Sequence, residues 1–235
     1  MAVTVIVPTY NEAQNLPILA EQLFALPIEG LSLLVIDDNS PDGTGQIAET
    51  LADKYQGRVE VIHREGKLGL GTAYVRGFTH ALGKGANTVV QMDADLSHSP
   101  SYIPKMLARL EEADVVIGSR YVSGGGVDSN WSPLRKVLSR WGSIYSRALL
   151  GLHMHDTTGG FRCFRASALK DIHVERIASN GYVFQVEVIY LCQKVGLRIA
   201  EVPILFLERT NGTSKMSSKI AFEAAWRVWQ IKLRS

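Results

Sequence analysis

Short apolar runs alternate with segments of helical spacing throughout the first half of the chain. Two of these runs, SLLVID at 32–37 and VVQMD at 89–93, are apolar almost without interruption. Strands of this kind are buried on both faces, as in a parallel sheet with helices on either side. The alternation therefore predicts an α/β fold with a mostly parallel central sheet, flanked by helices and connected by right-handed crossovers.

The predicted elements follow from these runs and from the helical spacing between them. In the first half, strands are expected at 3–9, 31–37, 59–63, 88–93 and 115–120, and helices at 12–25, 45–55, 72–83 and 100–112. In the second half, helices are expected at 132–152, 183–195 and 217–233, and strands at 161–165 and 197–205. Glycines 124–126 and residues 209–214 are expected to form loops.

Three of the predicted strands end in polar residues. The first ends in PTYNE at 8–12, the second in DDNSPDG at 37–43 and the fourth in DAD at 93–95. Ligands of open α/β sheets bind beyond the carboxyl ends of the strands, so these residues are expected to share one crevice. Asp93 and Asp95 are two apart on extended chain, so their side chains point the same way. Their mutual repulsion is relieved by a cation, and carboxylate oxygens suit Mg²⁺ or Mn²⁺ that also binds substrate phosphates.

Each of these acidic residues also has a plainer interpretation. Asp93 and Asp95 fit a solvated turn, but their position after an apolar strand, beside two other acidic strand ends, favours the cation. For Glu12, a ligand role and a carboxylate that complements a helix dipole are equally good interpretations. Asp38 fits a helix N-cap, a role for which Ser40 or Asp42 is better placed.

Charge and missing motifs exclude several classes of protein. Lys and Arg number 25 against 23 Asp and Glu, a net charge of +2, which argues against a nucleic-acid binder. The chain has no GxxxxGK[ST] and no complete GxGxxG, which argues against a P-loop enzyme and an NAD(P) oxidoreductase. No apolar stretch is long enough to span a bilayer, so any membrane role is expected at the surface.

The segments VIVPTYNE, VIDDNSPDGT, KLGLGTAYVRG, MDADLSH and GSRY, in this order, resemble the inverting glycosyltransferases of family 2. The segments DTTGGFRCFR, NGYVFQVEV, EVPILFLER and TNGTSK extend the resemblance to about residue 215, and more closely to the polyprenol (dolichyl) phosphate mannose synthases within that family. PTYNE and DAD occur in many sugar transferases, whereas DADLSH, GYVFQVE and ERTNGTSK are much more specific. The chain lacks QxxRW, which argues against a processive polysaccharide synthase.

The resemblance implies a nucleotide-sugar-binding fold of the GT-A type over residues 1–215, and the helical spacing beyond it predicts a C-terminal amphipathic helix at 216–235. It also implies inverting transfer of mannose from GDP-mannose to a polyprenyl (dolichyl) phosphate, giving polyprenyl phosphate β-mannose, with Mg²⁺ or Mn²⁺ as cofactor. Asp95, with Asp93, would hold the metal. The residues that would contact the nucleotide sugar are Pro8, Tyr10, Glu12, Ile36, Asp38, Asp93, Ala94, Asp95, Arg209 and Lys215.

A phosphate acceptor explains why no general base is evident. A phosphate monoester has a second pKa near ~6, so it is mostly dianionic at neutral pH and needs orientation rather than deprotonation. Arginine suits bidentate phosphate contacts, and the segment 120–147 is rich in it. We expect Arg120 and Arg135 to bind the acceptor phosphate, and Arg120 to act with Asp93 and Asp95 as a catalytic residue.

Two predicted helices carry apolar stripes beside basic residues. The stripe at 132–152 includes Leu134, Val137, Trp141 and Ile144, and the last helix carries Trp226 and Trp229. Such helices fit a membrane surface, and they fit packing on the protein core equally well. We expect a peripheral protein on the cytoplasmic face of a membrane, held there directly or by a separate anchor subunit.

Two other functions remain compatible with the sequence. A glucosyltransferase that moves glucose from UDP-glucose to polyprenyl phosphate would bind the same diphosphate, and only the resemblance favours mannose. The second alternative is a non-catalytic protein that binds nucleotide sugars or acts as a scaffold at a membrane surface. The acidic and basic residues gathered here argue against it, because such a protein has no need for them.

Overall fold

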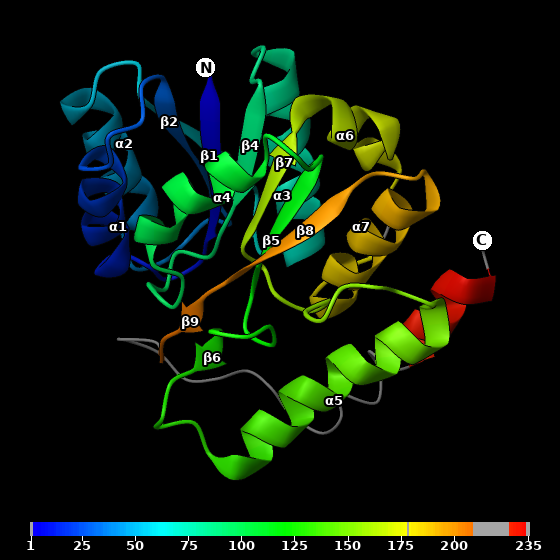
Figure 1. The fold of residues 1–235 in the computed structure, drawn as a ribbon. Helices are drawn as coiled ribbons and strands as arrows, with labels where there is room; N and C mark the ends of the chain where they lie inside the picture. The colour runs from blue at the N-terminus through cyan, green and yellow to red at the C-terminus, as the bar shows by residue number, and fades with distance from the viewer. Residues whose placement is uncertain (1, 178, 209–225, 234–235) are drawn as a thin grey trace.

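The computed structural model describes residues 2–177, 179–208 and 226–233. Seven strands form one sheet in the order β3-β2-β1-β4-β7-β5-β8 (Figure 1). Their neighbours are parallel except at β7, which pairs antiparallel with both β4 and β5. The strands are β1 Val3–Thr9, β2 Leu31–Asp37, β3 Val59–His63, β4 Thr88–Gln91, β5 Val115–Ser119, β7 Arg162–Arg165 and β8 Ile199–Pro203.

Helices cover both faces of the sheet (Figure 1). Successive side chains of β1 point to opposite faces of the sheet and so enter two different cores. Val5 belongs to one apolar cluster, and Ile6 belongs to the other, together with Phe78. Burial of both faces accounts for the nearly continuous apolar strands. The first cluster includes residues of α1 Asn15–Phe24, α2 Thr44–Lys54 and α4 Ile103–Arg109, and the second those of α3 Leu70–Gly83, α6 Ala166–Asp171 and α7 Tyr182–Lys194.

Helix α5, Pro133–Leu150, lies beyond the carboxyl ends of the parallel strands (Figure 1). A separate two-stranded sheet of β6, Gly126–Val127, and β9, Leu205–Phe206, lies between the main sheet and this helix. Residues 226–233 are helical and bury Val228 and Ile231 in the same core as α7. No helix in the described ranges is both long enough and apolar enough to cross a membrane.

The predicted α/β fold of the GT-A type is confirmed, and the first three strands have the predicted ends. Strand β4 ends at Gln91, so the DAD segment already belongs to a turn. The helix expected at 100–112 divides into a 3-10 turn, η1 Pro100–Tyr102, and α4. The sequence did not predict α6 or the 3-10 turn η2 Val174–Arg176, and Gly126 lies in β6 rather than in a loop. The loop expected at 209–214 lies outside the described residues.

Candidate functional site

The turns that follow β1 and β2 are joined by hydrogen bonds at the carboxyl edge of the sheet. The Thr9 hydroxyl donates to Asp37 Oδ1 at 3.0 Å, and the Asp38 amide donates to the Thr9 carbonyl at 3.0 Å. The amide of Glu12 donates to the Thr44 hydroxyl at 2.9 Å. These bonds bring Tyr10, Glu12 and Asp38 to one place, as the strand-end rule predicts.

Asp38 is paired with an arginine that the sequence reasoning missed. Arg64 Nη1 lies 2.6 Å from Asp38 Oδ1, and both side chains are more than nine-tenths buried. Arg64 also donates to the Thr72 hydroxyl at 2.6 Å, in the first turn of α3. Burial raises the pKa of Asp38, although the attraction of Arg64 opposes this. Arg64 directly follows β3, so the strand-end rule would have found it had the third strand been included.

The other residues expected to contact the nucleotide sugar differ in where they lie relative to this edge of the sheet. Lys67 Nζ lies 4.2 Å from the centre of the Tyr10 ring, a cation–π contact that holds the ring at the edge. The Glu12 carboxylate accepts a bond of 2.7 Å from the Asn15 side chain. Pro8 is half-buried, whereas Ile36, its partner across the two strands, is completely buried. The side chain of Ile36 therefore lies in the core and not at the edge.

Asp93 lies at the same edge, and two side chains hold it. The buried Tyr74 hydroxyl donates to Asp93 Oδ1 at 3.1 Å, and burial raises the pKa of that phenol well above its ordinary value, which keeps it a donor. The Asp93 amide donates to His98 Nδ1 at 3.4 Å. A Cβ at Gly160 would lie 3.5 Å from both carboxylate oxygens of Asp93, so this glycine leaves room beside them.

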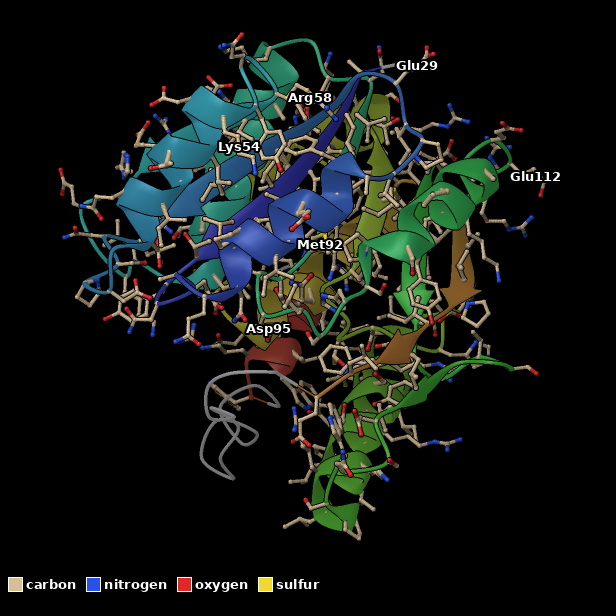
Figure 2. All side chains as sticks on the ribbon, turned by 90° about the vertical axis from the view of Figure 1, so that its left-hand side faces the viewer. Glu29, Lys54, Arg58, Met92, Asp95 and Glu112 are labelled. Carbon is tan, nitrogen blue, oxygen red and sulfur yellow. The ribbon has the colours of Figure 1, made fainter. Side chains whose placement is uncertain are left out.

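Asp95 is the more buried of the two aspartates, with 2% of its surface exposed. Its Oδ1 accepts hydrogen bonds from the hydroxyl and the amide of Ser97, which fix the turn. Figure 2 shows Asp95 at one edge of the sheet, with Glu29 and Glu112 near the opposite edge. Ala94, between the two aspartates, is 3% exposed.

His98 was given no role in the sequence reasoning because it has no metal-ligand spacing. Its ring lies 5.1 Å from Phe161 and 5.0 Å from Phe206, centre to centre. Burial lowers the pKa of His98, although Asp93 opposes this, and a neutral ring can accept the amide proton of Asp93. His98 thus supports the turn rather than binding as a charged group.

The antiparallel strand β7 brings a further loop to this edge. A strand that runs against its neighbours begins where they end, so residues 156–160 lie beside the ends of β4 and β5. The Asp156 carboxylate accepts two bonds of 2.7 Å from Arg120, through Nε and Nη2, and both side chains are buried. Asp156 also caps its own turn, since its Oδ1 accepts a bond from the Gly159 amide at 3.0 Å.

Arg162 bonds to main-chain carbonyls and not to the Asp156 carboxylate. Its guanidinium donates to the carbonyls of Gln185, at 2.7 Å, and Thr157, at 3.0 Å. Strand β7 buries Arg162 between β4 and β5, and this burial lowers its pKa to about 10. Carbonyl dipoles, rather than a carboxylate, satisfy its two Nη atoms.

Arg135 lies in the first turn of α5. Its Cζ is 3.7 Å from the centre of the Trp131 ring, and its Nη1 is 3.4 Å from Glu208 Oε1. The Trp131 ring is 5.4 Å from that of Phe206, and Arg120 Cζ is 5.6 Å from the same Phe206 ring. The two arginines expected at the acceptor therefore flank one pair of aromatic rings. Arg209 and Lys215 lie outside the described residues.

The arrangement fits the binding of a charged, elongated substrate. Acidic groups lie at the ends of β1, β2 and β4, and Arg120 lies at the end of β5. Within the described ranges, no three His, Cys, Asp or Glu side chains are grouped to hold a metal ion. Asp93 and Asp95 alone would thus leave positions on a cation for ligand oxygens and water.

Comparison with known proteins identifies the family of the chain. Residues 4–173 match the family described as Glycosyl transferase family 2. The undecaprenyl-phosphate mannosyltransferase of Micrococcus luteus is 45% identical over 236 residues, which cover 100% of this chain and 96% of that protein. The polyprenol monophosphomannose synthase of Mycolicibacterium smegmatis is 44% identical over 234 residues, covering 98% of this chain and 87% of that one.

Solved structures support the fold. Glucosyl-3-phosphoglycerate synthase from Mycobacterium tuberculosis, in complex with Mn²⁺, UDP and glucosyl-3-phosphoglycerate, superposes with a TM-score of 0.67 at 19% identity. The match covers 99% of this chain and 79% of that one. Together with the family match over most of its length, this shows that the chain belongs to glycosyl transferase family 2 and is a sugar-transferring enzyme.

Proposed function

We propose that the protein transfers mannose from GDP-mannose to the phosphate of a polyprenyl phosphate, with inversion at the anomeric carbon. The observation that carries the proposal is that groups of opposite charge follow neighbouring strands along one edge of the sheet. Asp93 and Asp95 follow β4, and Arg120 follows β5, with the Asp156 loop between them. The relatives named for mannose transfer to polyprenyl or undecaprenyl phosphate are similar over nearly the whole chain.

The reaction requires little proton chemistry. An oxygen of the acceptor phosphate forms a bond to the anomeric carbon while the bond from that carbon to the diphosphate breaks, and the electron pair leaves with the nucleoside diphosphate. Because the acceptor is already an anion, the protein has to orient it and balance its charge. Arg120 and Arg135 are the groups proposed for the acceptor phosphate, and Asp38, Tyr10 and Glu12 for the nucleoside.

A divalent cation fits this site. The carboxylates of Asp93 and Asp95 are hard oxygen donors, and the Asp93 side chain is 32% exposed, so a ligand can reach it. When bound, Mg²⁺ or Mn²⁺ would neutralise charge that develops on the departing diphosphate. Tyr74 and Ser97 hold the two carboxylates in place through the hydrogen bonds described above.

Helix α5 is proposed to lie on the membrane. Its face toward the protein consists largely of serines, with Ser139, Ser143 and Ser146 all buried. Its outward face carries Leu134, Val137, Trp141 and Ile144, each between 47% and 68% exposed. These four side chains therefore do not pack on the core, whereas Tyr145 and Leu149, further along the same stripe, do. An outward apolar stripe beside basic residues suits a lipid surface, close to where Arg135 would meet a lipid phosphate.

The last helix, of which residues 226–233 are described, was also expected to face lipid, and it too exposes large apolar side chains. Residues 226–233 expose Trp226 and Trp229 to 65% and 45% while burying Val228 and Ile231. Aromatic rings of this type are enriched where protein meets lipid headgroups. The membrane side on which the protein works, and a separate anchor subunit, stay predictions.

A Trp141→Ala variant is expected to bind vesicles of anionic phospholipid at least ~10-fold more weakly, because burial of one large apolar side chain contributes about 1.5–3 kcal/mol. Flotation of vesicles with the full chain measures this binding. The matched control is Ile18→Ala on α1, a side chain that is 45% exposed away from α5. Equal binding of Trp141→Ala and wild type would contradict the membrane role of α5.

The function is tested by presenting the enzyme with polyprenyl phosphate, Mg²⁺ or Mn²⁺, and radiolabelled GDP-mannose or UDP-glucose in parallel. We expect label to move into the organic phase from GDP-mannose, in a product with a β linkage by NMR. Preferential transfer from UDP-glucose would replace mannose with glucose in the proposal. Donor binding without transfer of either sugar would favour the scaffold interpretation.

A further inference from the structure

A short segment, residues 205–208, joins the two halves of the candidate site; we call it the strap. Its first two residues form β9, which pairs in parallel with β6. The amide of Asp128, which follows β6, donates to the Phe206 carbonyl at 2.8 Å. The strap is thus fixed along its length to the chain that leads into α5.

One side of the strap is bonded to the acidic turn. The Leu207 amide donates to the Ser97 carbonyl at 3.0 Å, and Ser97 in turn donates to Asp95. The Leu205 amide donates to the Tyr102 hydroxyl at 3.0 Å. The strap is therefore bonded directly to Ser97, the residue that holds Asp95.

The other side of the strap is bonded to the start of α5. The Glu208 amide donates to Asp128 Oδ2 at 3.1 Å, and Glu208 Oε1 lies 3.4 Å from Arg135 Nη1. Arg135 belongs to the part of the site proposed for the acceptor. Hence four consecutive residues contact both the acidic turn and the arginine of α5.

The ring of Phe206 fills the space between these two parts. It meets His98 edge to face at 5.0 Å and Trp131 edge to face at 5.4 Å. Arg120 Cζ lies 5.6 Å from the same ring. His98 supports the Asp93 amide, and Trp131 carries Arg135 on its face. A single half-buried ring thus spaces the acidic turn from both arginines.

We propose that Phe206 is a positioning residue that sets the distance between the turn of Asp93 and Asp95 and the arginines Arg120 and Arg135. The inference rests on the proposed function, in which these two groups face the donor and the acceptor. Transfer requires the acceptor oxygen to lie within about 3–3.5 Å of the anomeric carbon, and a shift of about 1 Å can slow a reaction ~100-fold. Attack by water on that carbon does not depend on the arginines. Misplacing the arginines therefore slows transfer to the acceptor more than it slows hydrolysis of the donor.

The test compares Phe206→Leu with Phe206→Tyr, which retains a ring that can meet its neighbours edge to face. For Phe206→Leu we expect kcat of mannose transfer to fall at least ~10-fold, with KM for GDP-mannose within about threefold of wild type. The ratio of hydrolysed GDP-mannose to lipid-linked product should rise in the same variant. Phe206→Tyr should restore both quantities to within about threefold of wild type.

The matched control is Phe24→Leu on α1, also a half-buried ring with an aromatic neighbour, Tyr55 at 4.4 Å, and a cation over its face. It should leave the ratio of hydrolysis to transfer unchanged. An unchanged ratio in Phe206→Leu overturns the inference, and so does a loss of transfer matched by an equal rise of donor KM or by failure of Phe206→Tyr to rescue. Failure of the proposed function is distinct, since wild type would then form no lipid-linked mannose.

Discussion

Replacement of Asp95 by asparagine is expected to reduce the rate of sugar transfer about 100- to 1,000-fold, the range measured when one fixed electrostatic contact is removed from an active site. The substitution keeps the size of the side chain and its bond from Ser97, while removing one negative charge from the turn. A cation between the diphosphate and this turn would then be held by Asp93 alone, so Mn²⁺ affinity in the presence of GDP should fall as well. Transfer assays and calorimetric titration with Mn²⁺ measure the two effects.

The control for this change is Asp114→Asn. Asp114 directly precedes β5, at the opposite edge of the sheet from Asp95, and binds Arg198. It should keep wild-type transfer and Mn²⁺ affinity. If Asp95→Asn also retained both, the acidic turn would not be the cation site.

Loss of the buried pair between Arg120 and Asp156 is expected to have the largest effect on stability. In Asp156→Asn, the guanidinium of Arg120 stays buried without a countercharge, and breaking such pairs costs about 3–5 kcal/mol in free energy of unfolding. Urea denaturation at neutral pH measures this. Asp114→Asn removes a pair in which Arg198 is 66% exposed, and such pairs contribute only about 0–1 kcal/mol. Similar losses in the two variants would contradict the importance of burial.

The same pair predicts a dependence of stability on pH. Burial by itself raises the pKa of Asp156, but the charge and hydrogen bonds of Arg120 outweigh it, so the pKa is lowered overall. A lowered pKa adds stability above the unfolded-state value, near ~4, and this stability is lost as the pH falls through the folded-state value. Denaturation series below pH 4 should therefore show a steeper loss for wild type than for Asp156→Asn.

The sequence predicted the elements of the first half well because each strand is an apolar run bounded by polar residues. It did not predict α6, a helix of six residues that is too short to show a period. It also did not predict the direction of β7, since an alternating or apolar pattern reads the same in both directions. The partner of Asp156 depends on that direction, because Arg120 lies 36 residues away in the sequence.

The candidate site could be predicted in part, because polar residues that follow apolar strands are visible in the sequence. The rule that polar residues gather at strand ends located Asp38, Asp93 and Asp95 without knowledge of their contacts. It did not identify Tyr74, which belongs to α3 and whose position depends on packing, or His98, which lies in the same turn as Asp95 but has no metal-ligand spacing. The apolar stripe of α5 was visible in the sequence, but the sequence did not show whether it faces the protein or the solvent. That depends on whether the serines or the apolar residues of the helix contact the rest of the protein.

The serine face of α5 has a consequence for the proposed membrane binding. Because hydroxyl groups of this helix bond to the rest of the enzyme, its apolar side is exposed without any rearrangement. If the protein adsorbs to a bilayer through this side, as proposed, adsorption needs no slow opening step and is governed by diffusion and by the charge of the lipid headgroups. In the absence of lipid, the same surface favours self-association, so detergent should keep the purified enzyme dispersed.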